Sequence, residues 1–153
     1  MLPLDPLDPR QRSVLRIRAG FAGAIFIGVT LVAAIAAEGS VRPIPLLVAA
    51  IAVALLMQVS VARRYRSWGY RVDADELHVG HGVLTRVRTV VPFARVQHID
   101  VAQGPLQRRF GLGTLVLHTA GTRASTVGLP GLRYEEAERL RDEIRSKIRQ
   151  EPA

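Results

Sequence analysis

The chain has 153 residues, of which 48% are hydrophobic and 22% charged, and its formal net charge is +8. It contains no cysteine, which excludes disulfide bonds, cysteine-ligated zinc, iron–sulfur clusters and thiol catalysis. Hydrophobicity and charge are unevenly distributed, because Glu38 and Arg42 are the only charged residues between Ala19 and Ala62. This composition indicates a membrane segment joined to a basic, water-soluble segment.

A polar segment, residues 1–18, precedes two apolar stretches without charge, residues 19–37 and 45–62. At about 1.5 Å rise per residue each stretch would form a helix of roughly 27–28 Å, close to the ~30 Å hydrocarbon thickness of a bilayer. A helix of this kind satisfies its own backbone groups in lipid. We therefore expect a transmembrane hairpin over residues 19–62.

Two other interpretations of the apolar stretches are open to argument. Small residues at 34, 36 and 37 resemble a signal-peptidase site, but the first stretch exceeds the ~7–15 apolar residues of a signal peptide, which favours an uncleaved anchor. A buried hairpin in a soluble protein is the other possibility. Two helices that are apolar on every side would need more surrounding protein than this chain supplies.

The arginines that flank the two stretches predict the orientation of the hairpin. Four precede the first stretch, Arg63, Arg64 and Arg66 follow the second, and the connecting loop has only Arg42. Basic residues are enriched on the cytoplasmic side of membrane spans. We therefore expect a multi-pass protein of the cell membrane with both termini in the cytoplasm.

Small residues recur at four-residue spacing on both stretches, at Gly20, Ala24 and Gly28 and at Ala50 and Ala54. Such a stripe lets helix backbones approach closely in lipid. It could pack the two helices against each other or pack the hairpin against another subunit. Neither stretch has an ionisable residue at mid-depth, which argues against transport.

From residue 63 to 153 the sequence predicts a cytoplasmic β-rich domain. Short β-branched runs are separated by Gly, Pro and Asp, a pattern typical of an antiparallel sheet or small barrel. These runs cover residues 68–72, 77–79, 83–91, 96–101, 114–119 and 125–129.

Two helical segments are expected in this domain. Leu106 and Phe110 are four residues apart and predict a short helical turn within residues 104–111. Apolar residues from Tyr134 to Ile148 have helical spacing and predict an amphipathic helix over residues 134–150. We expect this helix to cover an open end of the barrel, near bulky residues such as Trp68, Tyr70 or Phe110.

Residues 92–115, the His118-Thr-Ala-Gly121 run and the C-terminal helix together resemble the YdbS-type bacterial pleckstrin-homology-like (PH-like) membrane proteins, as do the hairpin and the Trp68-Gly-Tyr motif. The resemblance covers about residues 11–149. It implies a membrane-anchored α+β fold, in which a transmembrane hairpin precedes a PH-like split β-barrel of about seven antiparallel strands capped by a C-terminal α-helix. Some members are similar to one half of a gene pair whose other product is a larger membrane protein with several such domains, which implies a hetero-complex.

Residues that could support catalysis or metal binding have simpler explanations. His78 and His81 are three residues apart, on opposite sides of a regular strand, so we expect ordinary surface or partly buried histidines. Asp73, Asp75 and Glu76 are typical of a solvated turn. No phosphate-binding loop, nucleophile elbow, zinc-protease or dinucleotide motif is present. The sequence therefore predicts no catalytic residue, metal or cofactor, and no enzymatic activity.

Basic residues are the remaining functional signal. The candidates for contact with the membrane surface or with anionic headgroups are Arg63, Arg64, Arg66, Arg86, Arg88, Arg108 and Arg109. The Arg86-Val-Arg88 run is similar to the Arg-x-Arg with which eukaryotic PH domains hold phosphoinositide phosphates. The simpler interpretation is that arginines near an anionic membrane orient the protein, each contributing ~1 kcal/mol. Nucleic acid is not an expected partner, because no aromatic platform lies among the arginines.

We therefore expect a non-enzymatic, membrane-anchored interaction or scaffold subunit of a bacterial membrane protein complex. Besides the lipid bilayer, its expected partner is another membrane protein, such as a larger PH-like multi-span protein, or a second copy of the chain. The alternative function is binding or sensing of anionic lipid headgroups at the cytoplasmic membrane surface.

Overall fold

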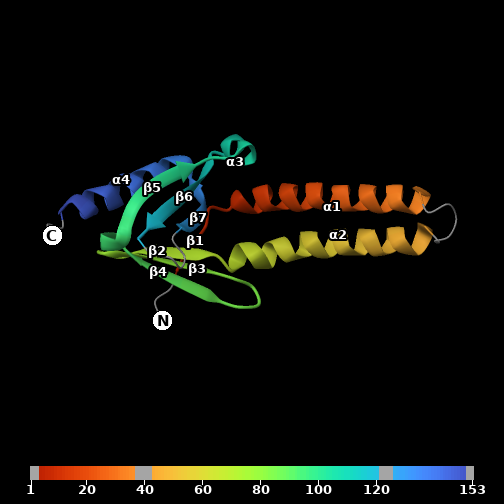
Figure 1. Ribbon diagram of the computed structural model, residues 1–153, viewed down its shortest axis with the longest axis horizontal. Coiled ribbons are helices and arrows are strands. Elements are labelled where there is room, and N and C mark those ends of the chain that lie inside the picture. Colours follow the sequence, from red (N-terminus) through yellow and green to blue (C-terminus); the bar gives the residue numbers. More distant parts are fainter. Residues whose placement is uncertain (1–3, 37–42, 121–125, 151–153) are drawn as a thin grey trace. The chain divides into compact units, whose positions relative to one another are not determined.

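The computed structural model describes residues 4–36, 43–120 and 126–150 (Figure 1). The chain divides into two compact units. One is a helical hairpin, Arg12–Tyr65, and the other is a β-rich domain made of Met1–Gln11 together with Arg66–Ala153. The structure thus assigns residues 4–11 to the domain, where the sequence analysis placed them in a separate N-terminal segment.

The hairpin consists of α1 (Gln11–Ala36) and α2 (Pro43–Arg66). Both helices are long and apolar enough to cross a membrane, and the most apolar 18-residue window of each is only 11% buried. A core helix of a soluble protein would be mostly buried, so the outward-facing apolar side chains favour lipid as the surroundings. The predicted connecting loop lies largely outside the described residues.

Among its described residues the domain has seven antiparallel strands in two sheets, which agrees with the number that the resemblance to PH-like proteins implied. The first sheet has the order β1 (Asp5–Pro6), β2 (Gly69–Val72), β3 (Glu76–His81), β4 (Val87–Pro92). The second has the order β5 (Val96–Ala102), β6 (Leu112–Thr119), β7 (Thr126–Arg133), and the short 3-10 turn η1 (Phe93–Arg95) joins the two sheets.

The strand boundaries differ from the sequence prediction around Gly82. We expected the glycine at residue 80 to end the strand, but β3 continues to His81. The run 83–91 was expected to be one strand, but residues 82–86 form a loop and β4 begins only at Val87. This loop leaves Val83 and Leu84 outside both strands.

The core lies between the two sheets and α4 (Tyr134–Gln150), whose bounds match the predicted helix. Alternate residues of β6, namely Leu115 and Leu117, are fully buried, as the two-residue period of a strand requires. From α4, the residues Ala137, Leu140 and Ile144 are buried. These residues are buried because α4 packs over the second sheet and over η1.

The surroundings of α4 correct part of the expectation. The helix lies mainly against β5, β6 and β7, strands that carry none of the three bulky residues expected near it. Trp68 instead stacks on His81, with ring centroids 4.9 Å apart. Tyr70 does reach the helix, since its hydroxyl donates a hydrogen bond of 2.8 Å to Glu136.

The strand β1 comes before the hairpin in sequence but belongs to the domain. Asp5 pairs with Tyr70 of β2, and the Asp8 amide donates a hydrogen bond of 2.9 Å to the carbonyl of Gly131. The Asp8 carboxylate also pairs with Arg133 at 3.2 Å. One folded domain therefore holds both ends of the hairpin, which requires an even number of membrane crossings between them. Cleavage after residue 37 would remove β1 from the domain.

Candidate membrane-surface site

The seven candidate arginines are all exposed, and they divide between the two units. Arg63 and Arg64 belong to α2 in the hairpin, and Arg66 begins the second part of the domain. The others lie on two features of the domain, Arg86 and Arg88 next to the β3–β4 loop, and Arg108 and Arg109 on α3 (Pro105–Arg109).

Within the domain, these two features share one end. Figure 1 shows the β3–β4 loop and α3 at the end of the domain where Gln11 and Arg66 lead out of it. Strand register supports the position of the loop, because Gly69 at the start of β2 pairs with Gly80 near the end of β3. The fold thus gathers arginines that are far apart in sequence.

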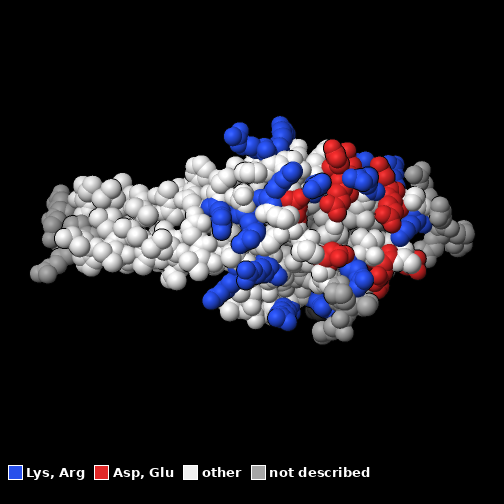
Figure 2. All heavy atoms as spheres, turned by 180° about the vertical axis from the view of Figure 1, so that it is seen from behind, with Lys and Arg blue, Asp and Glu red and all other residues white. Residues whose placement is uncertain are grey.

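Positive charge at this end is not balanced by nearby carboxylates in the sequence. No Asp or Glu occurs between Glu76 and Asp100, a stretch that contains the loop and all of β4. Figure 2 shows Lys and Arg side chains gathered at this end of the domain, while most acidic side chains on the face shown lie farther along it, among basic ones. Such an unbalanced surface attracts anions.

A buried glutamine explains why α3 presents its arginines to solvent. The Gln107 side chain accepts a hydrogen bond of 3.1 Å from the Gly104 amide and donates one of 2.9 Å to the Thr114 hydroxyl. Gln107 is therefore turned inward, and Arg108 and Arg109 face outward. The sequence analysis missed this anchor, although a glutamine at the third position of a short helix is a known capping signal.

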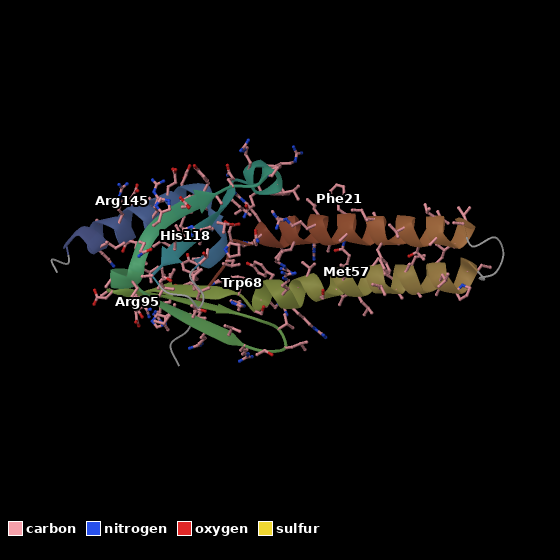
Figure 3. The ribbon with its side chains drawn as sticks, viewed as in Figure 1. Phe21, Met57, Trp68, Arg95, His118 and Arg145 are labelled. Carbon is pink, nitrogen blue, oxygen red and sulfur yellow. The ribbon has the colours of Figure 1, made fainter. Side chains whose placement is uncertain are left out.

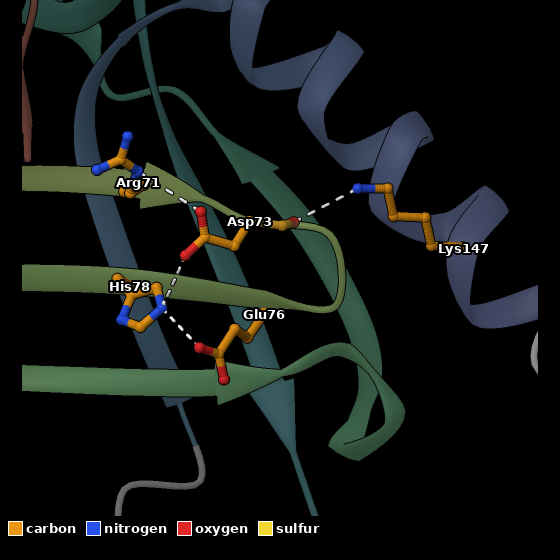
Figure 4. Close-up of polar contacts among 5 residues, drawn as sticks. All are labelled: Arg71, Asp73, Glu76, His78 and Lys147. Atoms are coloured by element: carbon orange, nitrogen blue, oxygen red, sulfur yellow. Dashed lines mark hydrogen bonds and ion pairs between the residues drawn. The ribbon is translucent and has the colours of Figure 1, made fainter. Parts of the chain in front are cut away.

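The acidic turn between β2 and β3 forms an ion-pair cluster with neighbouring side chains (Figure 4). His78 Nε2 lies 2.7 Å from Glu76 Oε1 and 3.2 Å from Asp73 Oδ2, and Arg71 Nε lies 3.5 Å from Asp73 Oδ1. One ligand atom from each of Asp73, Glu76 and His78 falls within 4.8 Å of the others, a spacing that a cation could bridge. The two carboxylates already have protein partners, the His78 ring and the Arg71 guanidinium.

A second histidine cluster arises from the pairing of β5 with β6. His98 lies opposite His118, and both rings approach the Asp100 carboxylate, at 2.8 Å and 3.2 Å. No local pattern predicts this contact, because cross-strand register brings the residues together. All three side chains are substantially exposed, as solvated ion pairs are.

In the hairpin, the predicted stripe of small residues is only partly at the helix contact. A side chain on Gly20 would lie 3.2 Å from Gln58 Nε2, and Ala50 is buried. Ala54 is half-buried and packs against Gly23, a residue that the sequence analysis did not single out.

The other two residues of the stripe lie elsewhere on α1. Ala24 and Gly28 are exposed, and nothing lies within 4 Å of a side chain built on Gly28. Figure 3 shows Phe21 pointing away from α2, as a lipid-facing side chain would. The interhelical hydrogen bond from Gln58 to the carbonyl of Arg16, at 3.2 Å, joins the two helices near their domain ends.

Comparisons with known proteins agree with this architecture. A family model described as Bacterial PH domain matches residues 14–148. In Bacillus subtilis (strain 168), the UPF0699 transmembrane protein YdbS is 42% identical over 81 residues, which are 53% of this chain and 49% of YdbS. The UPF0699 transmembrane protein YdbT of the same organism is 29% identical over 85 residues, 55% of this chain and 17% of YdbT.

The chain thus matches about half the length of YdbS and a much smaller part of YdbT. No solved structure matches it significantly. The family match begins in α1 and ends in α4, so it includes both the apolar hairpin and the two-sheet domain. The chain is therefore a membrane protein of the YdbS type and belongs to the bacterial PH domain family.

Proposed function

We propose that the chain is a non-enzymatic, membrane-anchored binding protein whose PH-like domain contacts anionic lipid headgroups at the cytoplasmic surface of the membrane that its hairpin crosses. The observation that carries this proposal is the gathering of Arg86, Arg88, Arg108 and Arg109 at the end of the domain from which the chain leads to the apolar helices. A cationic surface next to a span faces the leaflet with the negative surface potential.

Chain connectivity supports the same surface. Only Ser67 and Trp68 separate the last residue of α2 from the first residue of β2. The domain therefore follows the second apolar helix along the chain after two residues. Each arginine near an anionic surface contributes about 1 kcal/mol, so four are enough to orient the domain.

A binding role also agrees with the chemistry of the titratable groups. The two clusters around His78 and Asp100 consist of mutual ion pairs on partly or largely exposed side chains. In the Asp100 cluster the Thr126 hydroxyl lies 3.4 Å from His118 Nδ1, at the long end of the hydrogen-bond range and on an exposed surface. The geometry of the two clusters suits surface stabilisation better than proton transfer.

The test is the selectivity of the full chain for an anionic lipid. Reconstituted protein would be mixed with spin-labelled phosphatidylglycerol or spin-labelled phosphatidylcholine, and the motionally restricted fraction of each lipid measured by electron paramagnetic resonance. Arg86→Gln/Arg88→Gln and Arg108→Gln/Arg109→Gln should each reduce the preference for phosphatidylglycerol. The control Arg139→Gln/Arg145→Gln removes two exposed charges from α4 and should change it little. Equal selectivity in all variants would contradict headgroup binding by this end of the domain.

A second candidate function, as an interaction subunit for another membrane protein or a second copy, is favoured by the exposed small residues of α1. Ala24 and Gly28 lie away from α2 and leave room for another helix backbone. Gly28→Ile should weaken such a complex in mild detergent, measured as a loss of assembled mass. Ala22→Ile enlarges another exposed small residue and serves as the control. An unchanged assembly in both variants would argue against this face as an interface.

A further inference from the structure

The exposed apolar side chains of the domain are concentrated in the β3–β4 loop and in β4. Among its described residues, the large hydrophobic side chains that are exposed are Val83, Leu84, Val87 and Val90, at 49%, 99%, 41% and 46%. All four belong to the β3–β4 loop or to β4. Single exposed apolar residues are ordinary, but the adjacent Val83 and Leu84 at the loop tip, with Val87 next to them at the start of β4, indicate a surface that is covered in function.

The tip is held in place by the structure around it. Gly82 has a φ of +109°, and a Cβ at this position would collide with the Thr85 carbonyl, so only glycine fits this turn. The strands below pair in regular register, with Gly80 opposite Arg88 and His81 opposite Val87. Leu84 is therefore presented to solvent by a defined turn.

Strand direction places the tip at the end of the domain where residue 66 enters it. From the Gly69–Gly80 pair, the chain before β2 leads back to Arg66 at the end of α2, and the chain in β3 leads forward to the β3–β4 loop. Because the two strands are antiparallel, both paths leave the pair in the same direction. Arg66 is three residues from the pair along one path and Leu84 is four residues from it along the other, so both lie at this end of the domain.

Neighbouring side chains have the chemistry of a membrane interface. Arg86 and Arg88 follow the apolar tip directly, and the sequence from 77 to 99 has no acidic residue to repel an anionic surface. Trp68 stacks on His81 at the base of the loop, and tryptophan is enriched where protein meets the headgroup layer. Apolar residues beside basic ones are typical of segments that lie in the boundary between headgroups and acyl chains.

From these observations we infer that the β3–β4 loop inserts Val83 and Leu84 into the interface of the bilayer, with Arg86 and Arg88 on lipid phosphates. This inference rests on the proposed function, because the same end of the domain faces the lipid. The loop gives the domain a third attachment besides α1 and α2. A third contact would restrict which surfaces the domain presents to the cytoplasm.

The test uses the absence of cysteine in the chain, which makes single-site labelling clean. Nitroxides would be placed by Leu84→Cys and, as a control, by Ala74→Cys in full-length protein reconstituted into phosphatidylglycerol and phosphatidylcholine vesicles. Ala74 is also exposed and lies in the β2–β3 turn, at the opposite end of the same sheet. Since both positions are exposed, neither substitution threatens folding.

Collisions of each nitroxide with oxygen and with a water-soluble nickel chelate report its depth in the bilayer. We expect the label at 84 to collide several-fold less with the chelate, and more with oxygen, than the label at 74. Equal chelate accessibility at the two positions would overturn the inference. Shielding at 84 accompanied by dipolar broadening between labels on two chains would also overturn it, in favour of a contact between copies.

Failure of the insertion and failure of the proposed function are separable. If the label at 84 is accessible to the chelate while phosphatidylglycerol selectivity is retained, headgroup binding stands and insertion is wrong. If the label at 84 stays shielded when Arg86→Glu/Arg88→Glu is added, while the arginine variants above also keep full lipid selectivity, insertion stands and headgroup binding is wrong.

Discussion

Tyr70 and Glu136, which are 66 residues apart in sequence, join the first sheet to α4 by a hydrogen bond of 2.8 Å from the tyrosine hydroxyl to the carboxylate. The bond is partly buried, so its loss leaves a desolvated carboxylate without its donor. A hydrogen bond to a charged group contributes about 1.5–3 kcal/mol, and partial exposure places this one at the lower end. Tyr70→Phe should therefore lower the free energy of unfolding by about 1.5 kcal/mol, measured by pulse proteolysis of the full chain in detergent. Glu136→Gln keeps an acceptor oxygen and should cost less.

Ionisation of the same tyrosine predicts a loss of stability at high pH. Burial first, and then the hydrogen bond to Glu136, raise the pKa of Tyr70 well above its ordinary value of about 10. In the unfolded chain this tyrosine ionises near pH 10, while in the folded domain it stays protonated. Its contribution is therefore complete below pH 10 and is lost as the pH rises from 10 toward the folded pKa. Unfolding measured from pH 8 to 11 should show a fall that is smaller in Tyr70→Phe; an identical fall would mean that other groups cause it.

Ile144 tests the docking of α4. The residue is fully buried, and Ile144→Asp would place a carboxylate in that contact at a cost of several kcal/mol, unless it protonates or the helix undocks. A domain with about 5–15 kcal/mol of total stability should become strongly sensitive to protease. Arg145→Gln, on the exposed side of the same helix, should leave protease resistance unchanged. Equal resistance of Ile144→Asp and the parent chain would show that the helix is not held as described.

Gly131 tests the attachment of the N-terminal segment. Its φ is +77°, and a Cβ there would lie 2.7 Å from Gln11 Cγ. Gly131→Ala should cost about 1–3 kcal/mol and loosen residues 4–10, seen as faster hydrogen exchange in that segment. Gly128→Ala lies in the same strand, where the nearest atom to a Cβ is 3.9 Å away, and should exchange like the parent. Protection of residues 4–10 that survives Gly131→Ala would contradict this role.

Gly23 tests the contact between the membrane helices. A side chain on Gly23 would begin 3.1 Å from Ala54 Cβ, whereas nothing lies within 4 Å of one on Gly28. Gly23→Leu should separate α1 from α2 and lower the midpoint of thermal unfolding in detergent, while Gly28→Leu should leave the midpoint near that of the parent. The reverse order of midpoints would assign the contact to the predicted stripe instead.

Sequence patterns were sufficient where a segment is long and regular. The amphipathic spacing from Tyr134 to Ile148 gave the bounds of α4, and the two uncharged stretches gave the hairpin. They were insufficient where turn geometry decides. Residues 83–91 have the pattern of one strand, but the turn at Gly82 leaves Val83 and Leu84 in a loop, and β4 begins at Val87.

Register is the other property that local sequence does not encode. His98 meets His118, and Arg71 lies opposite His78, only because particular residues of neighbouring strands are paired. β1 was missed for a different reason, since a two-residue strand in a proline-rich segment has no period to detect. The arginines of the candidate site could be found from the sequence. That they lie at one end of the domain could be learned only from the fold.

Because β1 comes before the hairpin and β2 comes after it, pairing these two strands must close a loop that contains both apolar helices. Pairing Pro6 with Gly69 closes a loop of about 60 residues, which in a free chain would cost roughly 3–4 kcal/mol. The contact between α1 and α2 within that loop brings its two ends closer together, which lowers the entropy cost of pairing β1 with β2. A substitution that separates α1 from α2 should therefore also weaken the pairing of β1 with β2, although β1 belongs to the domain.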